Sequence, residues 1–110
     1  MNLNDLTNLQ WLEPWEPAAP GLEAELQREV GAGHPLFGRE AVSVGRRGDQ
    51  DDVLFFLPGD PFPLAVVHLT WAGRRERNPE WPHTSFYSSL EDWVDMRMVP
   101  DHLEYQGGSE

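Results

Sequence analysis

The hydrophobic pattern of this chain is organised around the stretch from Phe62 to Trp71. One face of that stretch carries Leu64, Val66 and His68, and the other face is apolar throughout. A strand that is largely apolar on both faces is typical of the middle of a sheet covered on two sides. The stretch is too short to span a bilayer and is interrupted by a histidine. We therefore expect it to be the central strand of the core.

Two further strands are predicted before it. Residues 40–46 alternate Val42 and Val44 with small or polar neighbours, which is typical of an edge strand with one wet face. Residues 53–57 are apolar throughout and end at a turn rich in proline and glycine, residues 58–61. Since a parallel crossover needs about a dozen residues or more, the short connections predict that the three strands form an antiparallel meander.

A first helix is predicted over residues 20–30. Leu22, Leu26 and Val30 fall on one narrow stripe, and acidic residues in the first turns suit the helix dipole. Gly31 is the expected C′ residue.

A second helix is predicted over residues 88–98. Ser88 as N-cap and Glu91 at the third helical position form a capping box, and Pro100 should end the helix. Its apolar stripe consists of Leu90, Trp93, Val94 and Met98.

The pattern as a whole predicts a single α+β domain: a three-stranded antiparallel meander with two packed helices. The domain should span residues 20–105, with residues 1–19 as a Trp/Pro-rich N-terminal arm and residues 106–110 as a frayed tail. Trp11 and Trp15 should pack the arm onto the domain. The residues expected to be buried are Leu54, Phe56, Val66, Val67, Leu69, Leu90, Trp93 and Val94.

Charge narrows the classes of partner. The chain of 110 residues has 8 Lys+Arg against 19 Asp+Glu, a formal net charge of −11. Its field repels nucleic acid and anionic lipid, so we expect neither nucleic acid nor a membrane as partner, whereas a basic protein surface fits. The acids are spread along the chain without a long block, so a role in solubility alone stays open.

The absence of cysteine excludes disulfides, thiolate metal sites and a cysteine nucleophile. The first residues have neither the basic nor the apolar region of a signal peptide, and we therefore expect a cytoplasmic protein.

Candidate chemistry gathers where the central strand ends. His68 and Thr70 share a face of the strand ~7 Å apart, and Trp71 leads into a loop with the densest positive charge in the chain. Guanidinium groups beside aromatic walls can bind a carboxylate or another small anion, although pairing of the same arginines with neighbouring acids stays open. The candidate ligand-binding residues are His68, Thr70, Trp71, Arg74, Arg75, Arg77, Trp81 and His83. For His68, a structural role with its ring bonded to a carbonyl or carboxylate is the alternative.

No metal or cofactor is expected. Residues 49–52 place carboxylates at alternate positions, as a calcium loop does, but the sixth and twelfth positions from Asp49 are Leu54 and Asp60 instead of Gly and Glu. The histidines at positions 34, 68, 83 and 102 match no local metal motif, and His34 should face solvent. The chain also has no GxSxG, Walker, GxGxxG or HExxH motif, so no catalytic residue is assigned and an enzyme is not favoured.

Several short segments stand out as a set: Asp52-Val53-Leu54-Phe55, Val66 to Trp71 with Gly73 and Glu76, Trp81-Pro82, Ser89 to Trp93, and Pro100-Asp101-His102. In these segments the chain resembles a group of small bacterial proteins of unknown activity. The resemblance runs from about Leu22 to Tyr105. It implies no activity, cofactor or catalytic residue.

Three classes of function follow. The first is a non-catalytic, immunity- or antitoxin-like module whose acidic surface binds a protein partner. The second is a small enzyme or a binder of an anionic small ligand at the end of the Leu64–Trp71 strand. The third is an accessory domain that pairs two copies through an exposed apolar patch, as a homodimer.

Overall fold

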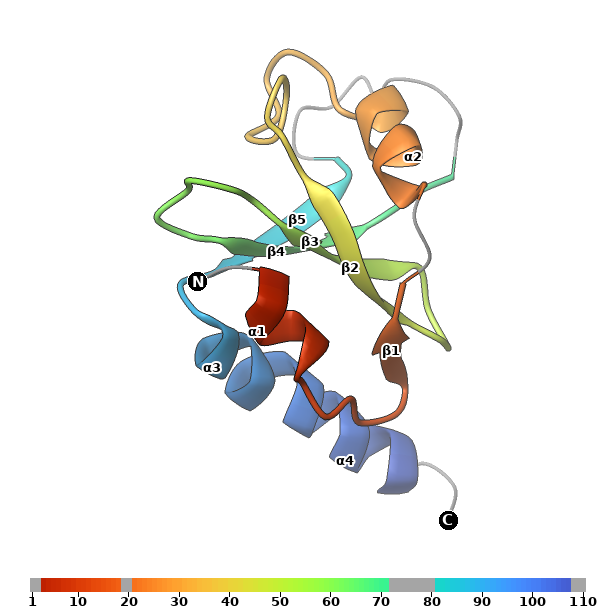
Figure 1. The fold of residues 1–110 in the computed structure, drawn as a ribbon. Coiled ribbons are helices and arrows are strands. Elements are labelled where there is room, and N and C mark those ends of the chain that lie inside the picture. The colour runs from red at the N-terminus through yellow and green to blue at the C-terminus, as the bar shows by residue number, and fades with distance from the viewer. Residues whose placement is uncertain (1–2, 19–20, 72–80, 108–110) are drawn as a thin grey trace.

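The computed structural model describes residues 3–18, 21–71 and 81–107 (Figure 1). It is an α+β fold in which one antiparallel sheet has the order β1-β2-β3-β4-β5. The strands are β1 (Trp15–Pro17), β2 (Val42–Arg47), β3 (Asp52–Phe56), β4 (Leu64–His68) and β5 (His83–Tyr87). The helical segments are α1 (Leu3–Thr7), α2 (Leu22–Glu29), α3 (Leu90–Trp93), the π-helix η1 (Val94–Met98) and α4 (Val99–Gly107). The last three follow one another without a break, and we call residues 90–107 the C-terminal helix.

The α+β class is confirmed, but the expected three strands and two helices were too few. The meander of β2, β3 and β4 has a further strand on each side, because β1 pairs with β2 and β5 pairs with β4. β1 has three residues, too few for a periodic signal. β5 begins with His83, Thr84 and Ser85, which lack the apolar alternation of a typical strand.

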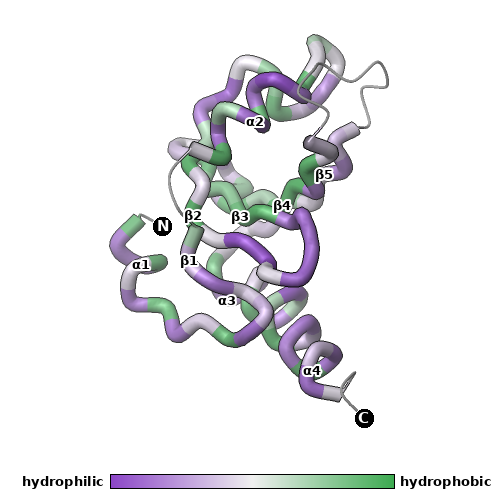
Figure 2. The backbone as a smooth tube through the Cα atoms, turned by 90° about the vertical axis from the view of Figure 1, so that its right-hand side faces the viewer, coloured by the Kyte–Doolittle hydropathy of each residue, from purple (hydrophilic) through white to green (hydrophobic). Residues whose placement is uncertain are grey.

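Each face of the sheet has its own core (Figure 1). α2 covers one face, on which Leu26 packs with Phe55 and Val67. α1 and the C-terminal helix cover the other, on which Trp93 packs with Leu54. Figure 2 shows β3 and β4 as largely hydrophobic segments between these layers, in agreement with the predicted central strand. Of the residues predicted to be buried, Leu54, Phe56, Val66, Val67, Leu69 and Trp93 are buried, and Leu90 and Val94 are partly buried.

Three tryptophans join the N-terminal segment to the core between the sheet and the C-terminal helix. Trp15 and Trp93 are fully buried, with ring centroids 5.1 Å apart in an edge-to-face arrangement. Trp11 contacts Trp93 in the same manner at 5.9 Å. Trp11 and Trp15 therefore pack onto the rest of the fold, as predicted, and β1 adds a strand to the sheet that the proline-rich sequence did not indicate.

The C-terminal helix continues past Pro100, so the prediction that Pro100 ends it was wrong. A proline inside an α-helix clashes with the carbonyl four residues earlier. Here the preceding turn is a π-helix, in which the Val99 N–H donates to the carbonyl of Val94, five residues back. This wider turn moves the carbonyls of the previous turn away from their α-helical positions. The N-cap also differs by one residue, because the hydroxyl of Ser89, not Ser88, accepts the Asp92 N–H at 3.0 Å.

Candidate functional site

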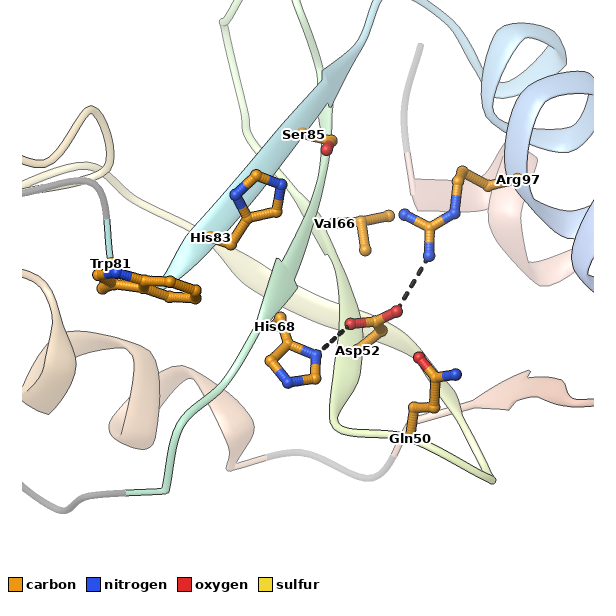
Figure 3. Close-up of a pocket in the computed structure, with 8 residues that line it drawn as sticks. All are labelled: Gln50, Asp52, Val66, His68, Trp81, His83, Ser85 and Arg97. Carbon is orange, nitrogen blue, oxygen red and sulfur yellow. Dashed lines mark hydrogen bonds and ion pairs between the residues drawn. The ribbon is translucent and has the colours of Figure 1, made fainter.

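A small pocket lies at one end of the sheet, on the face that the C-terminal helix covers. Its floor is a row of side chains in register across three strands, in which Asp52 of β3 lies opposite His68 of β4, and His68 lies opposite His83 of β5. The pocket has a volume of about 340 Å³. It is lined by Gln50, Asp52, Val66, His68, Trp81, His83, Ser85 and Arg97 (Figure 3).

Asp52 is the centre of the polar contacts in this pocket. One carboxylate oxygen lies 2.7 Å from Nδ1 of His68, and the other accepts a hydrogen bond from Arg97 at 3.0 Å (Figure 3). In the neutral imidazole, Nδ1 must carry the proton to donate to the carboxylate, which leaves Nε2 as an acceptor. The His68 side chain is 47% exposed, so this nitrogen is accessible. A carboxylate-oriented histidine can act as a hydrogen-bond acceptor or base for a ligand.

Arg97 connects the pocket to the interior. Its Nε lies 3.4 Å from the carboxylate of Asp101, which also accepts the indole N–H of Trp15 at 2.8 Å and lies 3.5 Å from Arg47. Burial by itself lowers the pKa of the Arg97 guanidinium. The hydrogen bond with Tyr87 and the charges of Asp101 and Asp52 outweigh burial, so the pKa lies above its ordinary value. Arg97 is therefore a permanent positive charge in the wall of the pocket.

The structure brings together His68, Trp81 and His83 from the predicted site residues. The rings of Trp81 and His83 lie 6.2 Å apart between centroids, and together they form an aromatic wall. Arg74, Arg75 and Arg77 lie outside the described residues. Their predicted role in binding an anion stays a prediction.

Thr70 and Trp71 belong to a different environment. β4 ends at His68, and the backbone N–H groups of Thr70 and Trp71 each donate to the carboxylate of Glu29 on α2 at 2.8 Å. Trp71 has a φ of 58°, which turns the chain away from the strand direction. Neither residue lines the pocket.

Sequence reasoning missed five of the pocket residues: Gln50, Asp52, Val66, Ser85 and Arg97. Only the strand register places Asp52 and Ser85 near His68. One signal for Arg97 was present, because it is the only Lys or Arg in residues 90–107. A lone cation on a helix rich in acids is a candidate for an inward ion pair.

His34 was expected to face solvent and is instead 5% exposed. Its Nδ1 accepts the N–H of Leu36 at 3.0 Å, so the ring proton must lie on Nε2, which is 2.9 Å from the carbonyl of Pro82. The ring thereby links the segment after α2 to the start of β5. In the part of the chain that the structure describes, no group of three or more His, Asp or Glu side chains could hold a metal ion.

A second surface of functional interest is the outer side of the C-terminal helix, which we call the acidic helix face. Its exposed members are Glu91, Asp92, Asp95, Met96, Leu103 and Glu104. Met96 and Leu103 are 66% and 62% exposed, the largest values among the exposed large hydrophobic side chains of the described residues. Arg97 contributes nothing to this face, because its guanidinium is turned toward the sheet (Figure 3).

Comparisons with known proteins provide no family for this chain: no family model, no curated protein and no solved structure matches it. Among the described residues, no helix combines the length and the apolar character that crossing a membrane requires.

Proposed function

We propose that this protein is a non-catalytic acidic interaction module that binds a basic protein partner through the acidic helix face. The observation that carries this proposal is the separation of charge along the C-terminal helix. Within residues 90–107 every exposed Asp, Glu, Lys or Arg side chain is acidic, and the single arginine is held inward by Asp52 and Asp101.

The apolar side chains of this face support the same proposal. Met96 and Leu103 are both exposed on the C-terminal helix, with part of the π-helical turn between them. Two large exposed anchors on one helix suit a groove that receives a helix face. Methionine adapts its shape to irregular apolar surfaces.

Charge complementarity supports a basic partner. Asp95 lies beside Met96, and Glu104 beside Leu103, so a partner groove with basic rims would place opposite charges around both anchors. The net charge of −11 would also accelerate the approach of a basic protein at low ionic strength.

The test begins with a photo-reactive residue in place of Met96, used to capture and identify a partner in the native host. Binding of the purified partner is then measured for Asp95→Lys and for Asp51→Lys, an exposed acid in the turn between β2 and β3. Both substitutions change the net charge equally. Asp95→Lys should weaken binding at least about tenfold, or about 1.4 kcal/mol, and Asp51→Lys far less. Equal effects would mean non-specific attraction, and no effect of Asp95→Lys would refute this face.

The pocket supports a second candidate function, the binding of a small anionic ligand at the end of β4. The specific observation is that the Arg97 cation and the rings of His68 and His83 line the same hollow of about 340 Å³, in which an anionic ligand would share Arg97 and His68 with Asp52. That volume suits a ligand at the small end of the usual range. NMR titration with acetate and with phosphate should shift signals of His68 and His83, and His83→Ala should weaken the effect. Shifts confined to the acidic helix face, or none at all, would count against this candidate.

A further inference from the structure

The two outer edges of the sheet differ in how well they are protected against pairing with a further strand. β1 has three residues and ends at Pro17, which has no N–H to offer to another strand. β5 has five residues, His83 to Tyr87, and pairs with β4 in unbroken register without a bulge. Among the described strands, none pairs with the outer side of β5.

β5 lacks the features that normally keep an edge strand single. Such edges are usually blocked by charged side chains, proline or a bulge. None of the five residues of β5 is Asp, Glu, Lys, Arg or Pro, although a quarter of the chain is charged. Phe86 within the strand is 36% exposed and Trp81 just before it is 44% exposed. Among the described residues, the strand at this edge therefore has no Asp, Glu, Lys or Arg, and exposed apolar side chains lie in or next to it.

We infer that β5 pairs with β5 of a second copy of this chain, antiparallel about a two-fold axis at Ser85. Centring on the middle residue pairs the whole strand: Thr84 lies opposite Phe86 of the second copy, and His83 opposite Tyr87. Two chains of charge −11 repel one another, so an uncharged strand is where two copies can approach at the least electrostatic cost. A contact of five residues per strand is small, and the dimer should form in the micromolar to millimolar range.

This pairing would also complete the pocket, independently of the proposed function. His83 and Ser85 lie on the pocket side of β5 at the edge of the sheet. In the dimer, Ser85 and Tyr87 of the second copy lie opposite them in the adjoining strand. The floor of the pocket would then continue from one copy into the other.

The experiment uses charges placed on the two-fold axis. Sedimentation equilibrium of the wild-type chain should show a reversible dimer as concentration rises from micromolar to millimolar. Ser85→Lys and Ser85→Glu each place like charges directly opposite one another, and each should raise the dimer Kd at least about tenfold. An equimolar mixture of the two should restore the dimer, because the charges across the axis are then opposite. Gln27→Lys and Gln27→Glu, exposed on α2, are the matched controls and should leave the dimer unchanged.

Each outcome decides the inference. A monomeric wild-type chain at millimolar concentration overturns it, as does a dimer that persists in both Ser85 variants. A mixture that stays monomeric also overturns it. Should the variants fail to fold, amide NMR signals of residues 83–87 in the wild-type chain must shift with concentration, and signals that stay constant refute the pairing.

Discussion

At the scale of single residues, the side chain of Glu29 stabilises the turn that follows β4. Its side chain is fully buried, and it accepts the N–H groups of Thr70 and Trp71 at 2.8 Å each. Burial raises the pKa of Glu29, and the hydrogen bond with the carboxyl of Glu25 raises it further, while the two backbone N–H groups lower it only in part. Trp71 has a φ of 58°, which a tryptophan rarely adopts. The two hydrogen bonds to Glu29 hold the chain in this turn.

The raised pKa predicts a pH dependence of stability. The native state of Glu29 binds a proton more tightly than the unfolded state, whose pKa is near 4.5. The contribution of Glu29 to stability is therefore fully present below pH 4.5 and is lost as pH rises through the raised native pKa. Urea denaturation should show that the free energy of unfolding of the wild type, minus that of Glu29→Gln, falls from pH 4.5 toward about pH 7. A difference that is constant or that grows with pH would contradict the raised pKa.

At the scale of elements, Gly45 in the bulged strand β2 makes room for Trp11. The pairing of β2 with β3 shifts register between Ser43 and Gly45. Trp11 lies against the bulge so closely that a Cβ on Gly45 would stand 2.5 Å from its ring. Gly45 has no positive φ, so the need for glycine comes from this contact and not from backbone conformation. The missing side chain of Gly45 therefore leaves room for Trp11, and Trp11 in turn contacts Trp93.

Gly45→Ala should accordingly destabilise the fold by about 1–3 kcal/mol through overpacking. Thermal denaturation would measure the loss. Gly48→Ala is the control within the same hairpin, because its Cβ would meet no atom closer than 3.4 Å. Combining Gly45→Ala with Trp11→Leu should cost less than the sum of the two single changes, since the smaller side chain removes the clash. Strict additivity would show that Gly45 matters for another reason.

The elements also show how far the sequence could predict the fold. β3 and β4 have continuous apolar patterns because both of their faces are covered. Such patterns can be recognised in the sequence alone. β1 and β5 are strands because a neighbour offers hydrogen bonds, which leaves no periodic signal in their own residues. The site divides in the same way. His68, Trp81 and His83 adjoin the end of the central strand in sequence, whereas Asp52 and Arg97 reach the pocket only through strand register and the π-helical turn.

At the scale of the whole molecule, two sets of charges among the described residues differ in burial. The arginines Arg47 and Arg97 are largely buried and pair with Asp52 and Asp101 between the sheet and the C-terminal helix. Arg47 also pairs with Asp49 in the exposed turn between β2 and β3. The acidic helix face carries acids without a neighbouring exposed Lys or Arg within residues 90–107. Salt screens interactions between exposed charges strongly and those between buried pairs weakly. The repulsion among surface acids should therefore respond to salt more than the buried ion pairs do.

This difference in burial predicts opposite effects of salt on folding and on partner binding. Raising NaCl from about 0.01 M to about 0.1 M shortens the Debye length from about 30 Å to about 10 Å. The Tm should rise by several degrees, because self-repulsion of a chain with net charge −11 is relieved. The affinity for a basic partner should fall over the same range, because the same screening weakens attraction. Asp95→Lys combined with Glu104→Lys should reduce both salt effects. Calorimetry of the free chain measures the change in Tm, and titration with the captured partner measures the change in affinity. A Tm that falls with salt would mean that the ion pairs of Arg47 and Arg97 dominate the electrostatics of folding.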